Sequence, residues 1–298
     1  MPSRNQPLSQ KTKHTTPLAP EIKFKIIPAP DNLKEDVECF RITEYSGEEK
    51  VAINVSLNGV PGIVFQHQRE HSAIQNIITL SGNSFVGAVP TLFIYGQNTE
   101  RSLMNLTPGS FAMTQVILKP HALKTLLGVN AAELTHKLVK LNEFSAGDLN
   151  ARLLEANTEQ KRLALLTNFL LAQQKRVKTD EGLVKESLGF IQKNIHAINV
   201  RDLLEHLSIS ERQFERRFTQ AVGISPQFYI RIKRFMEALR LMKTQKFERL
   251  TDIAHVLNYY DQSHFIRDMK EFSGTSPKNI SQKVADFHDQ GGYFQIKA

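Results

Sequence analysis

The sequence has very few of the features that would place a protein outside a reducing compartment or inside a membrane. It holds one cysteine, Cys39, among 298 residues, so it can form no intramolecular disulfide and no multi-cysteine zinc or iron–sulfur site. No run of about eighteen apolar residues occurs, and the first thirty residues lack the apolar core of a signal peptide. The sequence therefore predicts a cytoplasmic protein without a membrane partner.

Sequence signatures of catalysis are missing as well. No phosphate-binding glycine loop, nucleophile elbow or kinase signature occurs. His67 and His71 are four residues apart and could share a metal on a helix, with Glu70 as a base. Their surroundings favour a strand and a loop, however, and indicate no third ligand, while Cys39 is most simply a small core residue. We therefore predict no enzyme, no metal site and no cofactor.

Acidic residues are too few to balance the basic ones. The chain has 38 Lys plus Arg and 30 Asp plus Glu, which gives a formal net charge of +8. Residues 183–284 contain 17 basic and 11 acidic residues, so this third carries six of the eight net charges. A concentrated positive charge is typical of a protein that binds a polyanion such as nucleic acid.

Changes in composition divide the chain into five predicted segments. Residues 1–30 are basic and rich in proline, which favours a flexible lead. Residues 31–175 form a predicted sensing domain, residues 176–182 a charged linker, and residues 183–284 an all-α domain. Residues 285–298 form a tail to which the sequence assigns no role.

The sensing domain is predicted to be α+β, with a strand-rich barrel or sheet followed by helices. Runs of Val, Ile, Phe and Thr between turn signals predict strands at 37–44, 51–57, 62–67, 74–80, 91–95 and 109–118. Asn58-Gly59 is the strongest hairpin signal, because a type I′ turn needs positive φ at both central residues. Apolar residues at helical spacing then predict helices at 121–127, 131–138, 146–156 and 159–174.

Two helix-turn-helix units are predicted in tandem in the C-terminal third. In the first, a helix over 200–207 is followed by a second helix that starts at the N-cap Ser210, with Gln213 completing a capping box. Phe214 and Phe218 share its buried face. In the second unit, a helix over 250–257 precedes a helix capped by Asp261. A long helix from Ser225-Pro226 to about residue 244 connects the two units.

Helix starts that carry cations and amides on exposed faces are suited to reading base edges in a major groove. In the first unit these residues are Arg212, Gln213 and Arg216, and in the second they are Gln262, Ser263, His264 and Arg267. We expect base selection by Arg212, Gln213, Gln262 and His264, and anchoring by Arg216 and Arg267. Arg217 and Lys270 are expected to contact phosphate or to form ion pairs.

The C-terminal third resembles the DNA-binding domain of AraC/XylS-type bacterial transcription regulators over about a hundred residues. The resemblance is carried by Ser210-Glu-Arg-Gln-Phe-Glu-Arg-Arg-Phe218, Gly223-Ile-Ser-Pro226, Arg234, Ala238, Leu241, Ile253-Ala254, Asp261-Gln-Ser-His-Phe265, Lys270 and Gly274-Thr-Ser-Pro277. The family usually has glycine where Ser208 and Asn258 stand, alanine at Leu204, and phenylalanine at Tyr259 and Met269. The missing glycines would leave residues with a side chain in a left-handed turn conformation.

The resemblance implies a sequence-specific regulator that binds two successive major-groove segments of double-stranded DNA. A looser similarity over Val116 to Val129 implies an N-terminal effector domain controlled by a small molecule or a protein, with RNA polymerase as a further partner. A homodimer is a further candidate, although the stripe of Leu163, Leu166, Phe169 and Leu170 is expected to be buried in its own domain. Two alternatives stay open: a DNA-localised enzyme that uses His67 and His71, and a non-specific DNA-coating protein.

Overall fold

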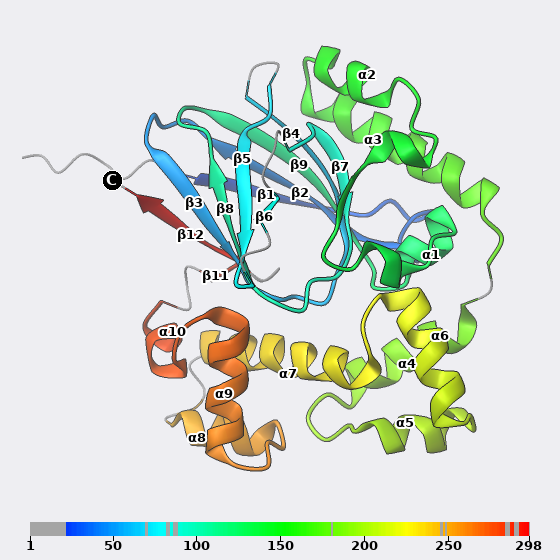
Figure 1. Ribbon diagram of the computed structural model, residues 1–298, viewed down its shortest axis with the longest axis vertical. Coiled ribbons are helices and arrows are strands. Elements are labelled where there is room, and N and C mark those ends of the chain that lie inside the picture. Colours follow the sequence, from blue (N-terminus) through cyan, green and yellow to red (C-terminus); the bar gives the residue numbers. More distant parts are fainter. Residues whose placement is uncertain are drawn as a thin grey trace, which may run out of the picture.

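The computed structural model contains a strand-rich N-terminal domain and a helical C-terminal domain (Figure 1). It describes residues 22–297 apart from 69–70, 82–83, 86–88, 180, 245–246, 248, 284–286 and 289–291. Most of the predicted lead therefore lies outside the described residues, as do Arg69 and Glu70 and part of the tail. The predicted fold class, α+β followed by all-α, is confirmed.

Two antiparallel six-stranded sheets build the N-terminal domain. The first sheet has the order β1 (Ile22–Pro28), β2 (Val37–Tyr45), β9 (Phe111–Leu118), β4 (Gly62–His67), β7 (Leu92–Tyr95) and β10 (Leu138–Lys140). The second sheet has the order β11 (Phe287–His288), β12 (Gly292–Lys297), β3 (Lys50–Val55), β8 (Ser102–Leu106), β5 (Ile74–Thr79) and β6 (Ser84–Phe85).

Side-chain alternation along the first sheet gives it two apolar faces. One face carries Val64, Phe93 and Met113, which pack against residues of the second sheet such as Ile53 and Leu106. The opposite face carries residues such as Phe40, Ile63 and Phe65, which pack under helices. The covering elements are α1 (Ala122–Leu127), η1 (Ala131–Leu134), η2 (Leu141–Phe144), α2 (Leu149–Glu155) and α3 (Glu159–Arg176). The first sheet is therefore the middle layer of the domain.

The six predicted strands correspond to β2, β3, β4, β5, β7 and β9, but other strands were not predicted. Residues 22–28, assigned to the flexible lead, form β1 and pair with β2. Residues 138–140 form β10 rather than the end of a helix. Residues 292–297 of the unassigned tail form β12, which pairs with β3. β10 has only three residues, too few to show alternation, whereas β1 lies among prolines that favoured a flexible lead.

The hairpin predicted at Asn58-Gly59 is wrong. β3 and β4 flank this turn, yet β3 belongs to the second sheet and β4 to the first. The loop instead reaches the C-terminal domain, where Leu57 is buried in the helical core. A side chain added at Gly59, whose φ is +73°, would touch Tyr229 and Ile232 of the C-terminal domain. Packing against another domain has overridden the local turn preference.

The C-terminal domain consists of helices around one aromatic core. Its elements are α4 (Gly182–Lys193), α5 (Val200–Leu207), α6 (Glu211–Val222), α7 (Pro226–Lys243), α8 (Leu250–Val256), α9 (Gln262–Ser273) and α10 (Pro277–Lys283). Phe214, Phe218, Phe235, Phe265 and Phe272 are all fully buried in this core. In Figure 1, α7 lies between α6 and α9, as predicted for the connecting helix. Among the described residues, no helix is both long enough and apolar enough to span a membrane.

Candidate nucleic-acid interface

The first helix-turn-helix unit is formed by α5 and α6. Asn199 and Asp202 make a capping box at the start of α5, and Ser208 ends the helix with φ at +49°. Ser210 is the N-cap of α6, as predicted, but its side chain accepts no backbone hydrogen bond. Its hydroxyl instead donates to Oε1 of Gln213 at 3.0 Å. The predicted capping box is therefore replaced by a side-chain contact that holds Gln213 at the exposed start of α6.

The second unit repeats this arrangement in α8 and α9. Asn258 occupies the turn with φ at +52°. Ser208 and Asn258, the two positions where the family usually has glycine, therefore both adopt the predicted left-handed conformation. Asp261 caps α9 by accepting a 2.7 Å hydrogen bond from the backbone N–H of His264. This confirms the predicted N-cap and fixes the start of the second candidate reading helix.

The structure leaves most of the predicted contact residues open to solvent. Those that are exposed are Arg212, Gln213, Arg216, Arg217, Gln262, Ser263, Arg267 and Lys270. None of their cationic groups takes part in an ion pair within the described part of the chain. His264 differs from the expectation, because it is half-buried, with its ring 5.3 Å from that of Tyr259. Its Nε2 lies 3.8 Å from Oδ2 of Asp268.

A charged clamp fixes α9 to the connecting helix. The guanidinium of Arg231 in α7 donates to Asp268 and to Glu271 of α9, each at 2.7 Å. Asp268 is 1% exposed, and the guanidinium also lies over the rings of Phe228 and Phe272. Burial alone would lower the pKa of Arg231, but the hydrogen bonds that it donates to the two carboxylates, together with their negative charges, outweigh burial and raise that pKa. The orientation of α9 on α7 is thus set by a buried ion pair.

The second helix of each unit, α6 or α9, is called a reading helix, and the C-terminal ends of both face the N-terminal domain. Gly223 ends α6, and its carbonyl accepts a 2.7 Å hydrogen bond from Thr135, just beyond η1. Gly274 ends α9, where an added side chain would collide with the guanidinium of Arg101. In Figure 1 the opposite, N-terminal ends lie on the far side of the helical domain. The predicted base-reading residues are therefore left uncovered by the docked N-terminal domain.

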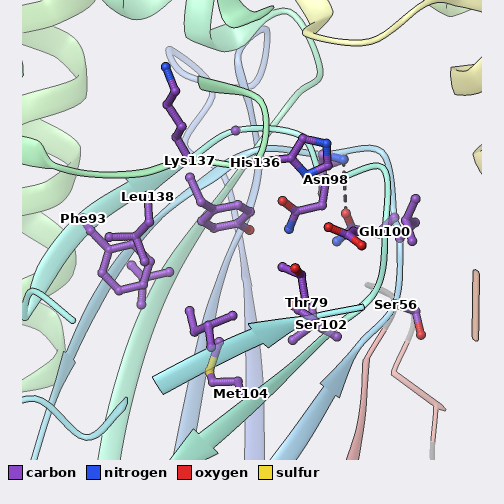
Figure 2. A pocket seen from close by; sticks show the side chains of 18 of the residues that line it. Ser56, Thr79, Phe93, Asn98, Glu100, Ser102, Met104, His136, Lys137 and Leu138 are labelled. Carbon is purple, nitrogen blue, oxygen red and sulfur yellow. Dashed lines mark hydrogen bonds between the residues drawn. The ribbon is translucent and has the colours of Figure 1, made fainter. Parts of the chain in front are cut away.

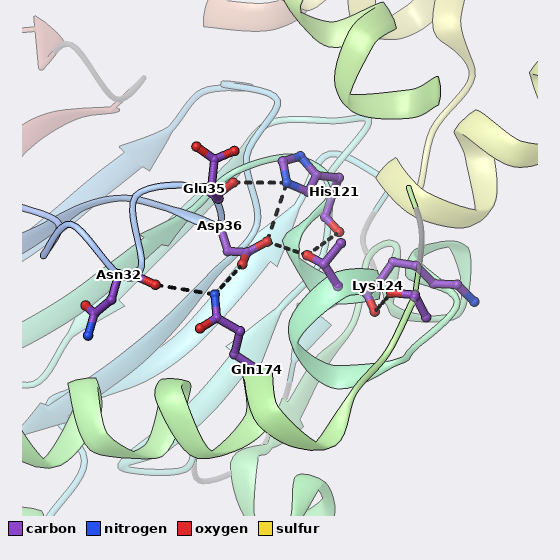
Figure 3. Close-up of polar contacts among 8 residues, drawn as sticks. Asn32, Glu35, Asp36, His121, Lys124 and Gln174 are labelled. Atoms are coloured by element: carbon purple, nitrogen blue, oxygen red, sulfur yellow. Dashed lines mark hydrogen bonds and ion pairs between the residues drawn. The ribbon is translucent and has the colours of Figure 1, made fainter. Parts of the chain in front are cut away.

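A buried polar network fixes α1 to the rest of the N-terminal domain (Figure 3). α1 is one of the elements that contact α6. Asp36 accepts hydrogen bonds from Thr125 at 2.6 Å and from Gln174 at 3.3 Å, and lies 3.5 Å from His121. Burial alone would raise the pKa of Asp36, but the contacts with His121 and Thr125 outweigh it and lower that pKa. The carboxylate thus ties α1 and α3 to the turn before β2.

A cavity of about 340 Å³ lies between the two sheets (Figure 2). Phe93, Met104 and Leu138 form part of an apolar wall, whereas Asn98, Glu100 and His136 gather at the polar side of the view. Glu100 accepts hydrogen bonds from the backbone and hydroxyl of Ser81. The cavity has the size and mixed lining of a small-molecule site.

The other groups singled out in the sequence, Cys39, His67 and His71, lie in the N-terminal domain. Cys39 is a buried free thiol whose pKa is raised by burial. His67 lies in β4 and His71 follows it in an isolated bridge, and the described residues contain no cluster of three metal-binding side chains. Leu166, Phe169 and Leu170 are buried against the first sheet, as expected. The apolar stripe of α3 therefore belongs to the domain core.

Comparison with known proteins decides the nature of the C-terminal domain. A family model described as a helix-turn-helix domain matches residues 203–283. The transcriptional activator RhaS of Pectobacterium carotovorum is 30% identical over 102 residues, which cover 34% of this chain and 36% of RhaS. The C-terminal domain is an AraC/XylS-type helix-turn-helix domain.

The AraC/XylS-type domain also aligns with other regulators. GbdR of Pseudomonas aeruginosa is 26% identical over 105 residues, covering 35% of this chain and 28% of GbdR. The chain thus spans about a third of the length of the curated relatives it matches, and these are named as transcriptional regulators rather than as enzymes.

Two further matches extend beyond the AraC/XylS-type domain. Residues 25–140 match a model described as a domain of unknown function, DUF6597. The crystal structure of ToxT from Vibrio cholerae is 14% identical, with a TM-score of 0.45 over 82% of this chain and 98% of ToxT.

Sequence reasoning missed the residues that join the cavity to the AraC/XylS-type domain. Thr135 precedes the cavity residues His136, Lys137 and Leu138, and Arg101 lies between the cavity residues Glu100 and Ser102. Neither Thr135 nor Arg101 belongs to a motif. The contact each makes depends on how the two domains meet, which local periodicity does not contain.

Proposed function

We propose that this protein is a sequence-specific transcription regulator that binds double-stranded DNA through α6 and α9. The observation that carries the proposal is the pair of exposed helix starts, each bearing amide and cationic side chains without an ion-pair partner in the described chain. Helix-turn-helix proteins place the N-terminal residues of such a helix against base edges in the major groove. The fold supplies two of these helices in one chain.

Different residues would supply affinity and specificity. Arg212, Arg216, Arg217, Arg267 and Lys270 would neutralise phosphates, so affinity would fall steeply with added salt. Gln213 and Gln262 would form paired hydrogen bonds with base edges, the geometry by which glutamine distinguishes adenine. For Arg212 and Arg216 we propose contact with guanine or with the backbone.

His264 and Ser263 complete the second proposed contact surface. The imidazole of His264 is half-buried against Tyr259, so only its outer edge is available to DNA. This arrangement supports a positioning role beside Gln262 rather than the independent base contact expected from sequence. Ser263 is exposed at the same end of α9 and is proposed to contact the backbone.

The connecting helix supports simultaneous binding of two groove segments. α7 has 18 residues and is therefore about 27 Å long at 1.5 Å per residue. Successive major-groove segments on one face of DNA are about 34 Å apart. A rigid helix of this length between α6 and α9 allows the two starts to reach neighbouring turns with modest adjustment.

We further propose that the N-terminal domain controls DNA binding. The segments that contact the ends of α6 and α9, around Thr135 and Arg101, continue directly into the wall of the cavity. A ligand that favours one arrangement of this wall would bias the placement of both reading helices. Because the RhaS relatives are named as activators, we propose activation, with RNA polymerase as the downstream partner and the cytoplasm as the compartment. The stripe on α3 is buried, so it supports no homodimer.

Selection of bound sequences from random DNA by the full-length protein, at near-physiological salt, tests this function. The proposal predicts an enriched motif of two blocks about one helical turn apart. Binding that follows only the salt concentration, with no enriched sequence, would contradict it and favour a non-specific DNA-coating protein.

A further inference from the structure

Arg41, a half-buried residue, places its guanidinium on the wall of the N-terminal cavity. It lies in β2, in a row with Gln115 of β9, Val64 of β4 and Phe93 of β7, all of which line the cavity. Its Nε donates to Oε1 of Gln115 at 2.6 Å. The titratable neighbours that affect the pKa of Arg41 are Tyr95 and Cys39, and both of these groups are neutral at physiological pH.

No carboxylate is paired with Arg41 among the described residues. Its Nη groups make no hydrogen bond in that part of the chain, and burial lowers its pKa. Glu100 also lines the cavity, but its carboxylate is bonded to Ser81. A charged group taken out of water is costly unless it is paired and hydrogen-bonded. In the described chain Gln115 is the side-chain hydrogen-bond partner of Arg41, and the cavity beside the guanidinium leaves room for an external anion.

We propose that the cavity binds a small amphipathic carboxylate, with its carboxylate on Arg41 and its apolar body against Val64, Phe93 and Met104. A guanidinium presents parallel N–H donors that match a carboxylate in a bidentate pair. Because Oε1 of Gln115 already accepts from Arg41, its amide NH₂ is left as a further donor beside the same position. This inference names the ligand class for the proposed control of DNA binding and rests on that function.

The size and lining of the cavity restrict the class of acid. A volume of about 340 Å³ is at the lower end of the range for small-molecule pockets, about 300–1,000 Å³, which favours a medium-chain or aryl-alkyl acid. A second cavity at the domain junction differs in its charge, because Glu35 and Glu38 line it together with Lys119, Lys185 and Lys233. In the cavity between the sheets, by contrast, Arg41 faces an apolar wall and has no ion-pair partner in the described chain.

Calorimetric titration of the full-length protein with octanoate and with 4-phenylbutyrate tests the proposal. Octanamide serves as the neutral probe of the same shape. We expect saturable binding of at least one acid and binding of octanamide that is at least about tenfold weaker, because a charge-assisted hydrogen bond is lost. Equal affinity for octanoate and octanamide, or no binding of either acid, would overturn the proposal.

Titration of Arg41 variants tests whether Arg41 is the residue that binds the carboxylate. Arg41→Gln should weaken binding of the acid by about tenfold to a hundredfold, whereas Arg41→Lys should retain part of the affinity. Arg152→Gln changes an exposed arginine of α2 in the same domain and should leave the dissociation constant within about twofold. Wild-type affinity in a folded Arg41→Gln variant would overturn the assignment. If that variant does not fold, the wild-type comparison of acid and amide and the Arg41→Lys titration decide the question.

The DNA selection described above separates this inference from the proposed function. Acid binding that depends on Arg41, combined with no enriched DNA motif, would contradict the regulator and leave the carboxylate site standing. An enriched two-block motif without acid binding would do the reverse. If both hold, the acid should change the affinity for the selected DNA in the wild type and not in Arg41→Gln.

Discussion

The two helix-turn-helix units share a design but are held in place by different forces. α6 of the first unit packs through Phe214 and Phe218 and forms no ion pair within the described chain, so its charged side chains remain available. α9 of the second unit is clamped to α7 by Arg231 through Asp268 and Glu271. α6 is therefore held on the core by apolar side chains without an ion pair in the described chain, while α9 adds a buried charge pair.

The units also differ in their contact with the N-terminal domain. α6 touches both α1 and η1 and its C-cap Gly223 accepts the hydrogen bond from Thr135, whereas at the end of α9 the side chain of Arg101 lies against Gly274. A change in the cavity wall would therefore act more strongly on the first unit. The second unit, with its clamp to α7, should keep its position when the cavity wall changes.

Removing an aromatic ring from either unit should have the largest effect. Phe214→Ala and Phe265→Ala each open a cavity in the shared core, so each should lower the free energy of unfolding by about 3–5 kcal/mol. Urea denaturation measures this loss. Similar costs would show that one core supports both units, and a variant as stable as the wild type would show that its ring is not part of that core.

Breaking the clamp should affect the second unit specifically. Arg231→Met leaves the buried Asp268 carboxylate without its partner and should cost about 3 kcal/mol. Arg240→Met, at an exposed arginine paired with Glu237 on the same helix, is the matched control and should cost at most about 1 kcal/mol. Equal costs for the two variants would mean that the clamp adds nothing to the placement of α9.

The contact between Thr135 and Gly223 can be removed without changing size. Thr135→Val deletes the hydroxyl that donates to the Gly223 carbonyl, a loss of about 1 kcal/mol. Hydrogen exchange at the C-terminal end of α6 should become about fivefold faster, while exchange in α9 stays the same. Faster exchange in both helices, or in neither, would contradict the asymmetry between the units.

Substitution of the turn residues should change the free energy of unfolding least, and should raise it, whereas the variants above lower it. Ser208→Gly relieves a left-handed residue in the first unit and should stabilise the protein by up to about 1 kcal/mol. Asn258→Gly should give only a few tenths of a kcal/mol, because asparagine tolerates this conformation better. Urea denaturation of each variant and of the wild type measures these changes in the free energy of unfolding. Destabilisation by Ser208→Gly would mean that the serine side chain makes a contribution larger than its strain.

Local sequence signals were sufficient for the reading helices and insufficient for what surrounds them. The 3.6-residue period, the N-caps Ser210, Ser225 and Asp261, and the buried aromatic pairs predicted the starts of α5 to α9 to within about one residue. Asn58-Gly59 failed because Leu57 packs into the other domain. β8 and β10 were missed because short or mixed strands carry little periodicity. β1 was missed although apolar and basic residues alternate along it, because the prolines around it favoured a flexible lead.

The cavity was beyond prediction for a related reason. Arg41 shares its face of β2 with Cys39 and Thr43, but Phe40 and Ile42 on the opposite face are buried as well. A strand that is buried on both faces shows no alternation from which the side facing a cavity could be read. Only the pairing of β2 with β9 brings Arg41 next to Gln115.

The central claim is that α6 and α9 each read their own block of DNA, and selection from random DNA with single variants tests it most directly. Gln213→Ala should relax base preference in one block and Gln262→Ala in the other, each losing about 1–3 kcal/mol on the wild-type site. Gln220→Ala, exposed at the far end of α6, should select the wild-type motif. Unchanged motifs in both Gln213→Ala and Gln262→Ala would contradict the account.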